Sequence, residues 1–140
     1  MRALILTLVT AFVTLPAHAQ TSRKDYVDMC VAAIEEIPDF SCADGATIPV
    51  TVIGILITSS DFQKDMLCDH PSLLDNGAGS DGQCVPGSRI LNHSSATAQV
   101  SVMCRQKHNR PGGELLFDEI DVIAHDTSSG ATCWFQAEAT

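Results

Sequence analysis

The chain has 140 residues, a formal net charge of −9 and a hydrophobic content of 45%. This length fits one domain with a core of its own, and this hydrophobic content excludes a wholly disordered chain. The acidic balance argues against a nucleic-acid binder and against a protein that binds anionic membranes, because both need clustered Lys and Arg.

The first 19 residues have the three parts of an export signal. Arg2 precedes an apolar run over 3–15, and small residues stand at Ala17 and Ala19. This pattern predicts cleavage after Ala19 and a single mature domain over 20–140, whose net charge is −10 because Arg2 is lost. No run of the chain reaches the about 20 apolar residues that cross a bilayer, so we predict no membrane span. We expect a periplasmic or secreted protein.

All six cysteines follow the predicted signal, and they are Cys30, Cys42, Cys68, Cys84, Cys104 and Cys133. An even number of cysteines in an exported chain predicts disulfides. The sequence leaves the connectivity open, and pairing of neighbours (30–42, 68–84 and 104–133) is the simplest hypothesis. The spacing contains no C-x-x-C, and a lone close Cys/His pair such as Cys104 with His108 is a weak signal for a metal. We therefore predict neither a metal nor a cofactor.

Residues 22–37 are expected to form a helix. Ser22 and Asp25 have the spacing of a capping box, and Pro38 disfavours a helical conformation at the residue before it. Apolar side chains recur at helical spacing along one face, at Tyr26, Val27, Cys30, Ala33, Ile34 and Ile37.

The rest of the chain is typical of β-structure. Residues 48–57 are rich in β-branched side chains and predict a strand buried on both faces. Alternating or β-branched stretches predict further strands over 99–105, 120–125 and 131–137, the last two joined as a hairpin. A long loop is expected over 71–87, and a turn over 109–113. The predicted fold class is α+β, with an N-terminal helix packed on an antiparallel sheet and stabilised by disulfides.

A group of carboxylates near the end of the chain is a candidate for chemistry. Asp118, Glu119 and Asp121 precede the apolar part of strand 120–125, and alternation places Glu119 and Asp121 on one face. Paired carboxylates can transfer protons when burial separates their pKa values, so Asp121 with His125 is the candidate pair for a small hydrolase. The alternative, which we favour, is a solvated strand edge that resists aggregation.

Three other signals are weaker. The acidic loop 75–82 has oxygen ligands that suit calcium, but Asp, Asn and Gly also make ordinary turns. Ser80 lies in a stretch one residue short of the G-x-S-x-G motif and lacks the strand and helix that the motif needs. A basic turn could hold an anion or could offset the acidic surface, through Arg105, Lys107, His108 and Arg110.

Trp134 adjoins Cys133 on the last predicted strand, where Cys133, Phe135 and Ala137 share one face. Alternation turns Trp134 to the other face. It either contacts a ligand there or covers a second layer of the core.

Four stretches together resemble an uncharacterised cysteine-containing module of exported bacterial proteins. They are DFSCADGATIPVTV over 39–52, CDHPSLL over 68–74, QCVPGSR over 83–89 and GATCWFQ over 130–136. In some of those proteins the module precedes domains with c-type haem sites. The resemblance attaches no activity to the module, and this chain has no C-x-x-C-H of its own.

The sequence thus favours a non-enzymatic exported module that binds or docks to an exported protein or a small ligand. Two alternatives stay open: an accessory subunit to a haem electron-transfer protein, as the resemblance implies, and the small hydrolase built on Asp121 and His125.

Overall fold

The computed structural model describes residues 22–71, 79–112 and 114–139. The predicted signal over 1–19 and residues 75–78 of the acidic loop lie outside the described residues. In the described part, no helix is long and apolar enough to cross a membrane. The predicted α+β class is confirmed: one N-terminal helix accompanies a five-stranded antiparallel sheet.

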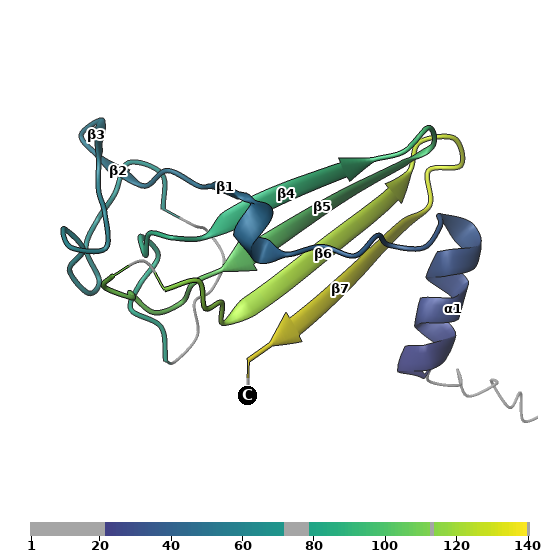
Figure 1. Cartoon of the computed structure of the whole chain (residues 1–140), viewed down its shortest axis with the longest axis horizontal. Coiled ribbons are helices and arrows are strands. Elements are labelled where there is room, and N and C mark those ends of the chain that lie inside the picture. Colours follow the sequence, from purple (N-terminus) through teal and green to yellow (C-terminus); the bar gives the residue numbers. More distant parts are fainter. Residues whose placement is uncertain (1–21, 72–78, 113, 140) are drawn as a thin grey trace, which may run out of the picture.

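The sheet runs in the order β1-β4-β5-β6-β7 (Figure 1). Three of these strands were predicted, and they extend slightly beyond the predicted limits: β5 (Ala98–Arg105), β6 (Glu119–Asp126) and β7 (Thr132–Glu138). Sequence reasoning missed β4 (Arg89–Ser94) and the two-residue β1 (Ala46–Thr47). β4 mixes charged, amide and hydroxyl side chains with two apolar ones, so it shows no clear alternation.

Helix α1 (Arg23–Ala33) begins at the predicted cap. The Ser22 hydroxyl accepts a hydrogen bond from Asp25 N at 3.1 Å, and Ser22 N donates to the Asp25 carboxylate at 3.2 Å. The predicted end was wrong, because the helix stops at Ala33 instead of continuing to Ile37. Ile34 and Ile37 instead pack against the buried face of the sheet, and this tertiary contact outweighs their helical spacing.

After α1 the chain crosses the sheet to a short 3-10 helix, η1 (Cys42–Asp44) (Figure 1). This crossing segment covers the core. Its side chains pack on one face of the sheet, which we call the core face, whose buried residues are Leu91, Val100, Val102, Cys104, Val122 and Ala124.

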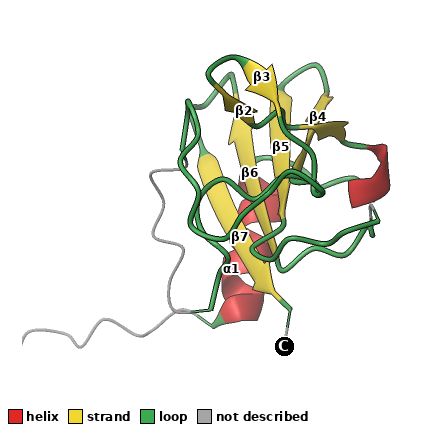
Figure 2. Cartoon of the chain, turned by 90° about the vertical axis from the view of Figure 1, so that its left-hand side faces the viewer, coloured by secondary structure: helices red, strands yellow, loops and turns green. Residues whose placement is uncertain are grey.

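The predicted buried strand over 48–57 was wrong. Its residues form a two-stranded hairpin, β2 (Thr51–Val52) and β3 (Ile55–Leu56), which projects at the loop end of the molecule (Figure 2). Ile53 and Gly54 make the turn with φ values of 52° and 75°. The apolar side chains of the turn and of β3 are exposed, and Ile53 is 89% exposed. Gly54 allows a tight turn in the middle of the run. The run therefore folds back as a short hairpin instead of forming one long strand of the sheet.

The disulfides are Cys30–Cys133, Cys42–Cys104 and Cys68–Cys84. Only the last of the three neighbour pairings is correct. Cys104 and Cys133 both face the core, but β6 lies between their strands, and Cys104 opposes Ile120 while Cys133 lies beside Ala124. They are therefore too far apart to pair. Instead Cys104 bonds to Cys42 of η1, and Cys133 bonds to Cys30 of α1, which lies beside β7 (Figure 1). Three such bonds indicate an oxidising compartment.

Candidate functional site

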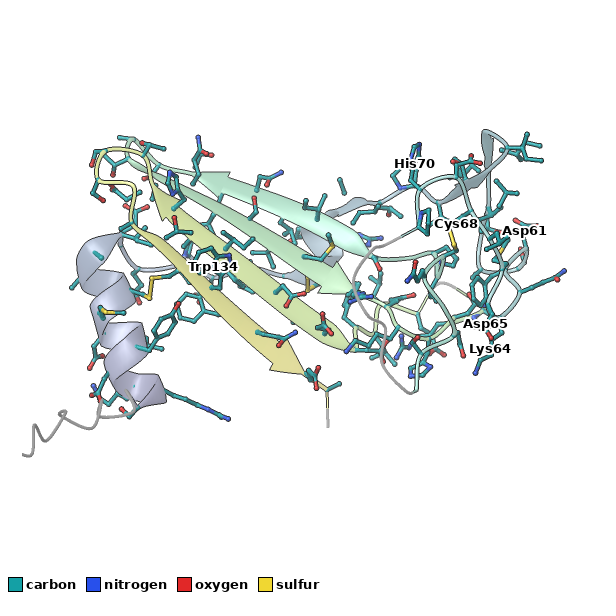
Figure 3. All side chains as sticks on the ribbon, turned by 180° about the vertical axis from the view of Figure 1, so that it is seen from behind. Asp61, Lys64, Asp65, Cys68, His70 and Trp134 are labelled. Atoms are coloured by element: carbon teal, nitrogen blue, oxygen red, sulfur yellow. A yellow bond between two sulfur atoms is a disulfide. The ribbon has the colours of Figure 1, made fainter. Side chains whose placement is uncertain are left out.

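The strands β4 to β7 turn their remaining side chains away from the core, onto a surface that we call the open face. Because side chains alternate along a strand, every second residue contributes to it, and the pairing register arranges these residues in four rows. Figure 3 looks onto the open face, with Trp134 on β7. From one end to the other the rows are Ser94–Gln99–His125–Thr132, Asn92–Ser101–Ile123–Trp134, Ile90–Met103–Asp121–Gln136 and Arg105–Glu119–Glu138.

Trp134 is the most exposed large apolar side chain of the open face, with 60% of its surface accessible. Ile123 lies directly opposite on β6 and is 44% exposed. Trp134 therefore does not cover the core, and its ring is accessible to a ligand.

The backbone at Trp134 is held firmly. Its N–H donates to the Tyr26 hydroxyl of α1 at 3.0 Å, and the Tyr26 ring packs edge-on against Phe135 with centroids 5.6 Å apart. The adjoining Cys133 is bound to Cys30 of the same helix. An aromatic side chain on so constrained a strand loses little entropy when it binds a ligand.

Polar side chains around Trp134 and Ile123 are paired across the strands. The Ser101 hydroxyl donates to the Asn92 side-chain oxygen at 2.7 Å, and His125 Nδ1 lies 2.8 Å from the Thr132 hydroxyl. These contacts orient the amide nitrogen of Asn92 and Nε2 of His125 while leaving both atoms able to bond to a ligand.

The other end of the open face is charged. Glu119 is 5% exposed and forms ion pairs with Lys107 and with Arg105, the latter at 3.4 Å. Lys107 also reaches Glu138 at 3.3 Å. Burial opposes ionisation of Glu119, but the two cations outweigh it and keep the pKa of Glu119 below its ordinary value.

Asp121 lies beside this cluster, and burial together with the Glu119 carboxylate raises its pKa. It borders a cavity of about 310 Å³ between the open face and the loops. Arg105, Gln106 and Ser88 supply polar groups to this cavity, as does His70, which Figure 3 places among the loops. The apolar lining comes from Ile48, Pro49, Val50, Val85 and Met103. Alternation correctly predicted that Glu119 and Asp121 share a face, but both are more buried than an ordinary solvated edge.

The structure does not bring Asp121 and His125 together. Both are on the open face of β6, but four residues of strand separate them by about 13 Å. Ile123 stands between them, and His125 is bonded to Thr132. This geometry does not allow one proton to pass directly between the two side chains.

Ser80 and the basic turn have structural contacts. The Ser80 hydroxyl accepts from Gly82 N at 3.3 Å within its own turn. Arg110 makes two hydrogen bonds with the Asp118 carboxylate, at 2.6 and 2.9 Å. Arg105 and Lys107 form ion pairs with Glu119, so the basic turn offsets acidic charge, which was one of the two roles expected for it.

Among the described residues, no three His, Cys, Asp or Glu side chains could hold a metal ion together.

No family model, curated protein or solved structure matches this chain. The resemblance to the exported bacterial module therefore stays a prediction.

Proposed function

We propose that this protein is a non-enzymatic binding module of the periplasm or the extracellular space, and that the open face is its ligand surface. The observation that carries the proposal is the exposure of Trp134 and Ile123 side by side on a rigid sheet. Exposed aromatic side chains on rigid elements are typical anchors of binding surfaces.

The three disulfides fit this location, because a small domain exposed to proteases and to changes of medium gains stability from covalent cross-links. Glu119, Arg105 and Lys107 form ion pairs with one another, so their charges largely cancel. This arrangement suits a structural role of the cluster more than a catalytic one.

The hydrolase alternative has less support, because Asp121 and His125 are far apart on β6. The other alternative, an accessory subunit to a haem protein, would name the partner that binds the open face and is compatible with the proposed surface. It predicts that the gene has neighbours that encode C-x-x-C-H proteins.

A test can use the fact that Trp134 is the chain's single tryptophan. Protein labelled with 5-fluorotryptophan gives one ¹⁹F resonance, which can be followed in unpurified periplasmic and culture fractions of the source organism. We expect the resonance to shift or broaden when a ligand covers the ring.

The matched control moves the reporter off the open face. Trp134→Phe combined with Leu67→Trp places the label in the loops, where Leu67 is 87% exposed. A fraction that shifts the label at position 134 and leaves it unchanged at position 67 supports the proposal. Equal responses at both positions, or none at either, would contradict it.

A further inference from the structure

The row of the open face that contains Trp134 and the neighbouring row Ser94–Gln99–His125–Thr132 have an unusual composition. Their eight side chains include no Lys, Arg, Asp or Glu, although 25 of the chain's 140 residues are of these types. Outward-facing strand positions normally carry such charges, which keep the surface soluble and prevent edge-to-edge association. Here amides, hydroxyls and one imidazole surround one indole and one isoleucine.

We propose that the open face binds a neutral glycan, with a sugar ring stacked on Trp134. This inference rests on the proposed function and names the chemical class of its ligand. A pyranose ring has a face of C–H groups and a rim of hydroxyls. The indole ring stacks on the C–H face, and neutral donors and acceptors around it bond to the hydroxyls.

The surrounding side chains fit such a rim. The Asn92 amide nitrogen can donate, and His125 Nε2 can donate or accept, depending on the tautomer that its bond to Thr132 selects. Gln99 and Gln136 are exposed and offer both kinds of group. Because Asn92 and His125 are already oriented by Ser101 and Thr132, a ligand need not immobilise them.

The dimensions favour an oligosaccharide over a single sugar. The row from Asn92 to Trp134 crosses four strands, and three strand spacings of about 4.8 Å give about 14 Å. A strand face also binds oligosaccharides in the OB-fold, together with the adjoining loops.

The charge of the protein favours a neutral glycan over a nucleic acid, which is also a polymer of rings. Single-stranded nucleic acids also stack on exposed aromatic side chains, but they need a basic groove for their phosphates. The net charge of −9 and the absence of Lys and Arg from these two rows oppose a polyanion. Arg105, the cation in the last row of the open face, and Lys107, which follows β5, both form ion pairs with Glu119 at the far end of the face.

The test uses defined oligosaccharides as probes. Purified protein is titrated with the neutral sugars cellohexaose, maltohexaose, xylohexaose and chitohexaose, and with two charged ones, a glucosamine hexamer and an oligogalacturonate. Trp134 fluorescence and calorimetry report binding. We expect saturable binding of at least one neutral sugar, and binding about tenfold weaker or absent for the oligogalacturonate; the glucosamine hexamer, which the acidic chain attracts, measures the non-specific contribution of charge.

Variants then locate the site. Trp134→Ala should weaken the binding by about tenfold or more, because it removes the stacking surface. Leu67→Ala, which removes an exposed apolar side chain outside the open face, should leave the binding unchanged. If Trp134→Ala fails to fold, Ser101→Lys serves in its place, since Ser101 is exposed and the lysine brings a charge into the uncharged rows.

Three outcomes would overturn the inference: none of the neutral sugars binds, the oligogalacturonate binds equally well, or the variants on the open face bind as well as the wild type. The proposed function has its own readout in the ¹⁹F experiment. If protease treatment of an active fraction abolishes the shift at position 134, the open face binds a protein. The glycan inference then fails while the proposed function stands.

Discussion

The carboxylate of Asp69 accepts a hydrogen bond from the backbone nitrogen of Ile53 at 2.7 Å. It also accepts from Gly54 N and from the Thr51 hydroxyl, both at 2.8 Å, so one side chain holds the whole β2–β3 turn. This support is needed because Ile53 has a φ of 52°, a conformation that disfavours β-branched residues.

Ile53→Asn is expected to raise the free energy of unfolding by about 1 kcal/mol, because Asn tolerates positive φ and Asn-Gly is the preferred pair in this turn. Urea unfolding measures the change. Ile53→Ala is the control, since it removes the same exposed side chain and keeps the backbone strain. An Asn variant no more stable than the Ala variant would refute the strain argument.

Asp69→Ala is expected to loosen the hairpin without unfolding the sheet. The hydrogen bonds from Gly54, Thr51 and Ile53 lower the pKa of Asp69, so the carboxylate supports the turn when ionised. That support is complete above the ordinary pKa and is lost as the pH falls through the lowered pKa. The protection of the Gly54 amide, measured as its exchange rate relative to the intrinsic rate at the same pH, should therefore fall in acid in the wild type and be low at every pH in the variant.

The Asp118–Arg110 pair should make global stability depend on pH. The Arg110 guanidinium lowers the pKa of Asp118 to about 2, with help from Lys107 N and His108 N. A lowered pKa means that the ionised form stabilises the fold above pH about 4 and that this contribution disappears as the pH falls toward 2. We expect Asp118→Asn to lower the free energy of unfolding by about 1–2 kcal/mol at pH 7, and this difference should shrink as the pH falls to 2 and vanish below it. An undiminished difference at pH 2 would contradict the assignment.

Asp121 should behave in the opposite way. Burial and the Glu119 carboxylate raise its pKa, so its ionised form destabilises the fold, and stability rises as the pH falls through that pKa. Asp121→Asn is expected to raise the melting temperature by a few degrees at pH 7, and the gain should vanish in acid, where wild-type Asp121 is itself protonated. Thermal unfolding at several pH values measures this, with Asp118→Asn as the variant of opposite sign.

The disulfides should differ in their contributions. Cys42–Cys104 links η1 to a fully buried position of β5, so replacing both cysteines with Ala is expected to lower stability by about 3–5 kcal/mol. Removal of Cys30–Cys133 should instead release α1, whose only buried residue is Cys30. Loss of helical circular dichroism with a retained sheet signal would mark that release. Peptide mapping without reductant checks the three pairings directly.

The sequence alone was sufficient for features that depend on neighbouring residues. The Ser22–Asp25 cap, the alternation of β5, β6 and β7, and the outward orientation of Trp134 next to Cys133 follow from local spacing. The same alternation placed Glu119 and Asp121 on one face. Spacing did not determine the disulfides, since pairing of consecutive cysteines is correct for Cys68–Cys84 and wrong for the other two bonds.

Only the tertiary structure decided which distant residues meet. The order of the strands puts β6 between Cys104 and Cys133, and their partners come from η1 and α1. The hydrogen bond from Gly54 to Asp69 stabilises the turn by which the apolar run folds back on itself. The register across four strands places the uncharged side chains around Trp134. Sequence spacing determines the direction of each side chain along its own strand, whereas neighbours across strands depend on a packing that no single stretch of sequence contains.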